Sequence, residues 1–375
     1  MKHNYFKSLF FNLFILFSFG INQANAQEVN FDLSTLDFDG NGSALASTSL
    51  MWGLDGRLYF SEYPGTIKAL TIERVGDSNF KVTNTEVITG INDIQNHNDD
   101  GSEDSSIYRE TTGITLAGTA EFPIIYATSS DFRVGGGVTG GEGDTGLDTN
   151  SGIITRFTWN GTTWDVVDIV RGLPRSEENH ATNGLEFVTI GGIDYLIVAQ
   201  GGHTNGGSPS LSFNYAMEYA LSGAILSVNL DQIGTMPILN DNGRNYIYDI
   251  PTLDDPTRPN VNGITDPNNP AYNGIDVNDP FGGNDGLNQA MIVVGGPVQI
   301  FSPGYRNAYD LVVTESGAVY VTDNGPNGSW GGFPENEGMS GTVTNNYVPG
   351  EPDYNRYTKL CFWKLLRRSS KSGES

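Results

Sequence analysis

Short apolar runs bounded by turn-forming residues recur along most of the chain, which is the pattern of β-strands. Residues 47–73, STSLMWGLDGRLYFSEYPGTIKALTIE, show the pattern clearly, with apolar segments separated by turns. The Asp55-Gly56 pair between the first two segments is a strong two-residue hairpin signal. Beyond the N-terminal segment, no long stretch carries apolar residues at helical spacing. The pattern therefore predicts an all-β protein.

The same strand rhythm returns at intervals and predicts a series of similar sheets. It is found in residues 112–130 with 151–170, in residues 183–202 with 222–233, and again from residue 308, where the block is not completed. Three to four blocks of roughly four short strands each indicate a β-propeller. A β-sandwich uses similar short strands, but the recurrence of one strand–turn–strand motif at equivalent places favours the propeller.

Residues 251–290 separate the third block from the fourth, and they contain many Pro, Asn, Asp and Gly residues but few apolar ones. They predict a long loop within a wider loop region, residues 235–295, and not a separate domain. The loop contains oxygen ligands of the kind that calcium prefers, namely Asp276, Asn278, Asp279, Asn284 and Asp285. Because no EF-hand pattern is present, a loop held by its own turns is the favoured interpretation.

The first 26 residues have the features of a secretory signal peptide. Lys2 and Lys7 precede an apolar run at residues 9–19, and the Ala24-Asn25-Ala26 stretch provides the small residues that signal peptidase requires. The apolar run is shorter than a membrane span needs. We expect cleavage after Ala26, a secreted or periplasmic mature protein, and no membrane span after signal removal.

The net charge of −24 argues against nucleic acid and anionic membrane surfaces as partners. The single cysteine, Cys361, excludes an internal disulfide framework, so stability must come from a packed core or from bound ions. Cys361 lies in residues 356–375, which hold six of the 20 basic residues but one acidic residue. This shift predicts a propeller domain over residues 27–355, followed by an atypical basic tail. A frameshifted or prematurely ended reading frame is the favoured explanation, and a basic interaction tail is the alternative.

Two loops carry side chains suited to chemistry at the mouth of a propeller's central channel, where function is usually placed. His180 lies in residues 172–187, GLPRSEENHATNGLEF, directly before the first strand of the third block. Arg306 and Asn307 lie in residues 301–311, FSPGYRNAYDL, directly before the first strand of the fourth block. Because these positions are equivalent in successive blocks, we expect both loops at the same channel mouth.

The side chains of these loops have complementary chemistry. An imidazole with an ordinary pKa of about 6.5 can take a proton at neutral pH, which makes His180 a candidate base. Arg306 is a permanent cation that can stabilise an oxyanion, and Asn307 adds an amide donor and acceptor. Downstream, the Gly325-Pro326 turn offers backbone carbonyls that can coordinate a hard cation. Each residue also has an ordinary interpretation, as part of a turn or an ion pair.

With these motifs the chain resembles the soluble quinoprotein glucose dehydrogenases and their aldose and sorbosone dehydrogenase relatives, which are exported six-bladed propellers that use pyrroloquinoline quinone (PQQ) and calcium. Residues 172–187 look like the family segment with the catalytic histidine, which falls on His180. In residues 302–327, Arg306 and Asn307 match the cofactor-binding pair, and Gly325 and Pro326 match the calcium ligands. The resemblance implies an exported enzyme that oxidises an aldose hydroxyl by hydride transfer to PQQ, with His180 and Arg306 catalytic and a separate electron acceptor as partner.

The chain also departs from the family pattern. Asn179 stands where the family has an acidic residue, and Tyr305 stands where it has a histidine. The later basic residues that hold the PQQ carboxylates in the family have no match after Arg356. We therefore expect an incomplete propeller in which about four of six blades are represented. The alternative function is a non-catalytic exported propeller that binds glycans or proteins.

Overall fold

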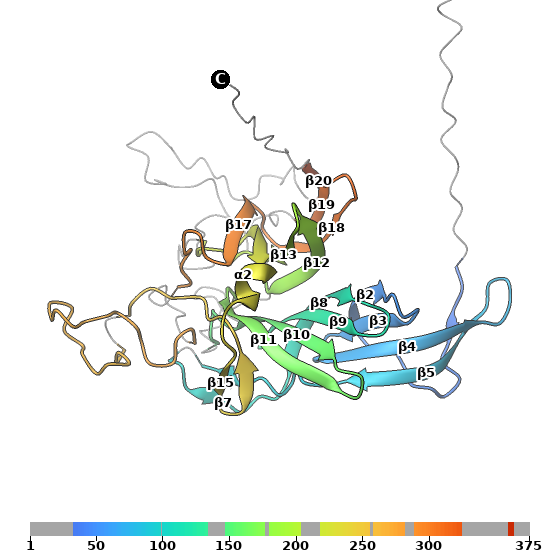
Figure 1. Cartoon of the computed structure of the whole chain (residues 1–375), viewed down its shortest axis with the longest axis horizontal. Coiled ribbons are helices and arrows are strands. Elements are labelled where there is room, and N and C mark those ends of the chain that lie inside the picture. Colours follow the sequence, from blue (N-terminus) through green and yellow to red (C-terminus); the bar gives the residue numbers. More distant parts are fainter. Residues whose placement is uncertain are drawn as a thin grey trace, which may run out of the picture.

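The structure is a computed structural model that is nearly all β, as predicted (Figure 1). It describes residues 33–98, 100–133, 147–176, 180–203, 218–255, 258–281 and 289–324, and the backbone of 359–363. The predicted signal peptide therefore lies outside the described residues. Among the residues described, no helix is long and apolar enough to cross a membrane.

The first two sheets are antiparallel meanders that begin at residues 47 and 109. The first sheet contains β2 (Ser47–Trp52), β3 (Leu58–Glu62), β4 (Thr66–Arg74) and β5 (Phe80–Ile88), with β1 (Leu36–Asp37) parallel to β5. The second contains β8 (Arg109–Gly118), β9 (Pro123–Asp131), β10 (Gly152–Trp159), β11 (Trp164–Leu173), β16 (Arg244–Tyr246) and β15 (Leu239–Asp241). A small hairpin between these sheets pairs β6 (Asn96–His97) with β7 (Glu103–Asp104).

The next two sheets repeat the arrangement. The third contains β12 (Thr182–Ile190), β13 (Ile193–Gln200), β14 (Ala224–Asn229) and β17 (Val298–Pro303), with a short helix, α2 (Leu230–Gly234), after β14. The fourth contains β18 (Ala308–Val313), β19 (Val319–Asp323) and β20 (Lys359–Trp363). Part of the predicted basic tail thus pairs, through its backbone, with β19.

The first strands of successive sheets lie side by side. β2 contacts β8, β8 contacts β12, and β12 contacts β18, so the described residues place four meanders around a common inner row of strands. This is the arrangement of a β-propeller, in which each blade starts at the centre and runs outward. The all-β, propeller-like architecture predicted from the sequence is therefore confirmed, while the six-bladed closure remains a prediction.

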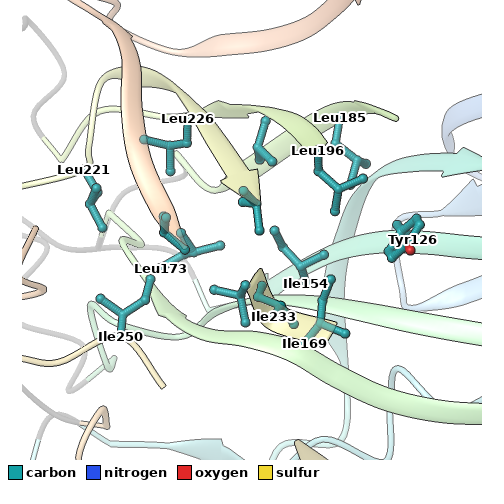
Figure 2. Packing of buried hydrophobic residues seen from close by; sticks show 14 of the residues in the cluster. Tyr126, Ile154, Ile169, Leu173, Leu185, Leu196, Leu221, Leu226, Ile233 and Ile250 are labelled. Carbon is teal, nitrogen blue, oxygen red and sulfur yellow. The ribbon is translucent and has the colours of Figure 1, made fainter. Parts of the chain in front are cut away.

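The apolar core lies between neighbouring sheets. Figure 2 shows Ile154 and Ile169 of the second sheet facing Leu196 and Leu226 of the third, with Ile233 of α2 among them. A further cluster joins the first sheet to the second, and another joins the third to the fourth. Each fully buried Leu or Ile contributes about 1.5–3 kcal/mol relative to exposure. Burial between blades thus stabilises a chain for which no disulfide is expected.

β13 shows why these strands contain unbroken apolar runs. Leu196 and Val198 pack into the core shared with the second sheet, while Ile197 and Ala199 pack into the core shared with the fourth. Because successive side chains of a strand point to opposite faces, a strand with a neighbouring sheet on each side buries both sets. The continuous apolar segment LIVA, residues 196–199, is therefore expected of a sheet that is covered on both faces.

The predicted loop region 235–295 contributes structure of its own at its start. β15 and β16 form a hairpin there, and β16 pairs parallel with β11 at the edge of the second sheet. The buried carboxylate of Asp168 accepts two bonds from the Arg244 guanidinium, at 2.6 and 2.8 Å. Arg244 also donates to the Gly90 carbonyl, at 2.6 Å. This arginine therefore ties the hairpin to two sheets.

Replacing Gly113 with alanine is expected to destabilise the fold by about 1–3 kcal/mol, because it overpacks the contact between two inner strands. A Cβ at Gly113 of β8 would lie 2.5 Å from the Asn183 carbonyl oxygen and 2.8 Å from the Gly184 Cα, and backbone atoms cannot yield as a side chain can. Urea unfolding measures the change. The matched control is Gly234→Ala, where a Cβ meets nothing within 4 Å. Equal stabilities of the two variants would contradict the close approach of β8 and β12.

Candidate functional site

His180 lies at the end of a short loop that leads into β12, as the sequence predicts, and its side chain is buried, with 1% exposure. The loop closes on itself because the Ser176 N–H donates to the His180 carbonyl, at 2.9 Å. The buried guanidinium of Arg175 donates to the same carbonyl, at 3.2 Å, and to the Asp131 carbonyl, at 3.0 Å. Arg175 thus fixes the backbone at His180 by hydrogen bonds.

The bond made by the His180 ring selects its tautomer. Nδ1 lies 3.0 Å from the carbonyl oxygen of Gly202, and a carbonyl can only accept, so Nδ1 carries the hydrogen and Nε2 is left unprotonated. Burial and, to a lesser extent, the nearby Arg306 charge together lower the pKa of His180 to about 3, against the opposing effect of the Gly202 bond. The ring is therefore neutral at pH 7, with one nitrogen able to accept a proton.

Arg306 and Asn307 connect β17 to β18, and they meet Gly201 and Gly202, the pair that follows β13 and lies beside His180. The Gly202 N–H donates to the Arg306 carbonyl, at 2.7 Å, and Gly201 forms a β-bridge with Asn307. Asn183 of β12 donates its amide N–H to Oδ1 of Asn307, at 2.9 Å. The structure thus brings together His180, Arg306 and Asn307, whereas Gly325 and Pro326 lie outside the described residues.

Gly201 and Gly202 allow this close approach. A Cβ at Gly201 would lie 2.8 Å from the His180 Cβ and 2.9 Å from Oδ1 of Asn307, and a Cβ at Gly202 would lie 2.6 Å from the Arg306 carbonyl oxygen. A side chain at either position would therefore push the glycine pair away from these neighbours. The glycine pair after β13 is a requirement of the site's geometry.

Asp323 supports the Arg306-Asn307 segment and was not predicted as a site residue. Its carboxylate accepts from the Asn307 N–H, at 2.8 Å, and from the Arg306 N–H, at 3.5 Å. Asp323 is the last residue of β19 and stands two positions before Gly325. It therefore links the arginine–asparagine segment to the start of the turn that the sequence predicts as a calcium ligand.

His203 is a second buried histidine beside the site, and it too was missed from the sequence. Its ring stacks on Tyr219 with centroids 3.6 Å apart, and its backbone N–H donates to the Glu218 carboxylate, at 2.6 Å. The charge of a protonated His203 would lower the pKa of His180, so the two rings are neighbours. A histidine directly after the Gly201-Gly202 pair at a strand end is the sequence signal that could have identified it.

We expect the two buried histidines to make the protein less stable in acid. Burial lowers the pKa of His203 to about 4, against 6.5 for an unperturbed histidine. Between these two pH values the unfolded chain binds a proton at residue 203 that the folded protein does not bind. Acidification therefore favours unfolding, by about 1.4 kcal/mol per pH unit for each such histidine.

Urea unfolding at pH 7.5 and pH 5 tests this effect in the wild type and in His203→Gln. The variant is expected to lose about 2 kcal/mol less than the wild type over that interval, because it lacks the titrating group. Stability curves that run parallel from pH 7.5 to pH 5 would show that His203 is not held neutral by burial.

Comparisons with known proteins find similarity at the level of solved structures alone. No protein-family model matches the sequence, and no curated protein matches it. A calcium structure of a Trichoderma reesei enzyme of carbohydrate-active family AA12 shares 11% identity over 76% of this chain and 47% of that chain, with a TM-score of 0.34. The holo form of the PQQ domain of pyranose dehydrogenase from Coprinopsis cinerea shares 11% identity over 77% and 46%, with a TM-score of 0.38.

A putative oxidoreductase (glucose dehydrogenase) from Thermus thermophilus shares 15% identity over 74% of this chain and 90% of that chain, with a TM-score of 0.30. This chain thus spans about half the length of the first two structures. Identities and TM-scores at this level assign neither a fold nor an activity. The functional argument therefore rests on the residues of the site.

Proposed function

We propose that the protein is a sugar oxidoreductase of the quinoprotein type, in which His180 is the base and Arg306 and Asn307 hold PQQ. The observation that carries the proposal is the neutral His180 ring beside the Arg306 cation, with Nε2 unprotonated because Nδ1 bonds to the Gly202 carbonyl. An uncharged base next to a fixed positive charge is a pair suited to alcohol oxidation, in which a proton leaves and negative charge develops.

The residues of the site fit the polar edge of such a cofactor. PQQ is a quinone that carries carboxylates, so a pocket for it needs a cation and N–H donors. Arg306 supplies the cation, and because Asn183 occupies Oδ1 of Asn307, that amide has its Nδ2 hydrogens to offer. With calcium on the proposed Gly325 and Pro326 carbonyl ligands, bound PQQ supplies the hydride acceptor.

His180 acts on the substrate in this proposal. Its Nε2 accepts the proton of the aldose hydroxyl, and the Gly202 carbonyl accepts the Nδ1–H and so stabilises the imidazolium as it forms. Burial keeps the ring neutral at pH 7, so the proton-accepting nitrogen is available in every molecule. Arg306 provides a positive charge that needs no reorganisation while negative charge develops in the site.

We further propose that the protein works after export, secreted or in the periplasm, with an aldose as substrate and a separate electron acceptor as partner. The basic, apolar and small-residue pattern of residues 1–26 supports export. The strongly acidic composition is compatible with a small neutral substrate and disfavours nucleic acid.

Titration with PQQ in a calcium buffer tests the proposal. We expect a shift in the quinone absorbance that saturates at one equivalent, followed by dye reduction when an aldose is added. Arg306→Met should weaken PQQ binding, while Arg74→Met, at an exposed position of β4, should not. An unchanged absorbance, or no dye reduction over a broad panel of sugars, would refute the proposal. Sugar binding without PQQ binding would favour the glycan-binding alternative.

A further inference from the structure

The stretch between β16 and β17 reaches away from the sheets and encloses polar oxygens. Figure 1 shows it as the gold-coloured excursion on the left. The chain turns back on itself there, with β-bridges between Thr252 and Ala290 and between Asn260 and Asp276. Residues 251–281 contain five acidic residues and one basic residue. With few apolar side chains to bury, this loop needs a polar source of cohesion.

Three side chains in the loop direct an oxygen inward without a hydrogen-bond partner among the described residues. The atoms are Oδ1 of Asp254, Asn260 and Asp276, all shielded from solvent. Asp276 is 1% exposed and Asn260 is 3% exposed. A buried oxygen of this kind carries a free-energy penalty unless water, a proton or a cation satisfies it.

Each of the three side chains is oriented by a bond to its other polar atom. Oδ2 of Asp276 accepts from the Asp255 N–H at 2.9 Å, and Nδ2 of Asn260 donates to the Ile264 carbonyl at 2.8 Å. Oδ2 of Asp254 accepts from the Tyr272 hydroxyl. The Oδ1 atoms are therefore held in position and are not free to rotate toward solvent.

The contacts of the loop place the three oxygens near one another. Asn260 and Asp276 are partners in an antiparallel bridge, so their side chains lie on the same face. The Tyr272 hydroxyl is within hydrogen-bond reach of both Asp254 and Asn260. The carboxylates of Asp254 and Asp276 are thus gathered with the Asn260 amide in one small volume.

We propose that Asp254, Asn260 and Asp276 bind a calcium ion inside this loop, at a site separate from the Gly325-Pro326 turn. Among the described residues, no three His, Cys, Asp or Glu side chains gather where they could hold a metal. The donor set is therefore two carboxylates, an amide oxygen and neighbouring backbone carbonyls or water. Hard oxygen donors on an irregular loop suit calcium better than magnesium, which demands a strict octahedron, or zinc, which prefers nitrogen and sulfur.

An ion in the loop would also fix the wall of a pocket. Directly after the site, Phe281 stacks on His97 with ring centroids 3.9 Å apart, and Asn278 donates to the Gly101 carbonyl at 3.2 Å. These residues and Arg171 line a pocket of about 430 Å³ against the second sheet. Calcium is therefore expected to protect from proteolysis both the loop and the segment around His97 and Gly101 that it contacts.

Terbium luminescence tests the site, because Tyr272 stands beside it and can transfer excitation to a bound Tb³⁺ ion. In protein without PQQ, we expect tyrosine-excited Tb³⁺ emission that calcium displaces. Asp276→Asn and Asp254→Asn should each weaken the calcium affinity at least about tenfold, since ligand charge sets affinity in such loops. Asp266→Asn is the matched control, since its exposed carboxylate bonds to Asn268. That variant should bind as the wild type does.

Two further variants keep the result decisive if a charge-removing variant fails to fold. Asn260→Asp adds a carboxylate and should tighten calcium binding, which a purely structural role for Asn260 does not predict. Tyr272→Phe should lose most of the sensitised emission while calcium still protects the loop from proteolysis, which assigns the signal to this site. Absence of calcium-displaceable emission in the wild type, or equal calcium affinity in Asp276→Asn and Asp266→Asn, would overturn the proposal. These outcomes do not depend on PQQ binding or sugar oxidation.

Discussion

Replacing Arg175 with methionine is expected to destabilise the protein by about 3–5 kcal/mol, because it leaves a buried carboxylate without its partner. Arg175 is fully buried, and its guanidinium lies 3.1 Å from the Glu110 carboxylate of β8. It also donates to four backbone carbonyls, those of Asp131, Arg133, Ser176 and His180. Methionine fills a similar volume but satisfies none of these acceptors.

Urea unfolding of Arg175→Met, Glu110→Gln and the double variant measures the coupling of the pair. The double variant should lose less stability than the sum of the single variants, because a neutral glutamine side chain in place of Glu110 needs no counter-charge. Burial already raises the pKa of Glu110, so protonation in acid should reduce the cost of Arg175→Met. The exposed Arg74→Met serves as control and should change stability by less than about 0.5 kcal/mol. A loss below about 1 kcal/mol in Arg175→Met would contradict the buried network.

Replacing His180 with asparagine is expected to lower sugar-dependent dye reduction by about 10²–10⁴-fold, which is the usual contribution of a positioned base. An asparagine Nδ2–H can still donate to the Gly202 carbonyl in place of the histidine Nδ1–H, so the loop should keep its geometry. PQQ affinity and the unfolding free energy of the variant should therefore stay near those of the wild type. A loss of activity without a loss of PQQ affinity or stability is the result expected of a catalytic base.

The control for this variant is His97→Asn, a histidine that packs on Phe281 and lines the pocket by the β6–β7 hairpin. It should retain activity. The pH profile gives a second readout: because His180 has a pKa of about 3, kcat/KM should not fall near pH 6.5 as acidity increases. Full activity in His180→Asn, or a descending limb centred near pH 6.5, would contradict the assigned role.

Much of the architecture could be predicted from local sequence. The Asp55-Gly56 turn lies between β2 and β3 as predicted, because a turn depends on neighbouring residues alone, although residues 53–57 join the strands and the prediction of a two-residue loop was wrong. The apolar runs mark strands for a similar reason, since Leu196 to Ala199 alternate between two cores. The equivalence of the two loops also predicted that His180 would meet Arg306 and Asn307. That prediction required only the repeated strand blocks of the sequence, in which the two loops occupy equivalent positions.

The residues that complete the site could not be predicted in this way. Asp323 acts through backbone N–H groups that lie 16 and 17 positions away, and Arg175 pairs with Glu110, which is 65 positions away. In the sequence each is an ordinary charged residue. The place of His203 in the site depends on tertiary packing, because its ring stacks on Tyr219 beside His180. Such roles depend on which strands become neighbours, and composition does not encode that.

The sequence by itself determined the all-β class, the repeated strand blocks and the pairing of a histidine loop with an arginine–asparagine loop, because periodicity and turn chemistry act over a few residues. The tertiary structure decided the rest. The protonation state of His180 depends on burial and on the Gly202 carbonyl, and the inward oxygens of Asp254, Asn260 and Asp276 depend on how their loop folds back. The protonation of a buried ring and the burial of an oxygen atom both require a space closed off from water. Such a space forms only when segments distant in the sequence pack together.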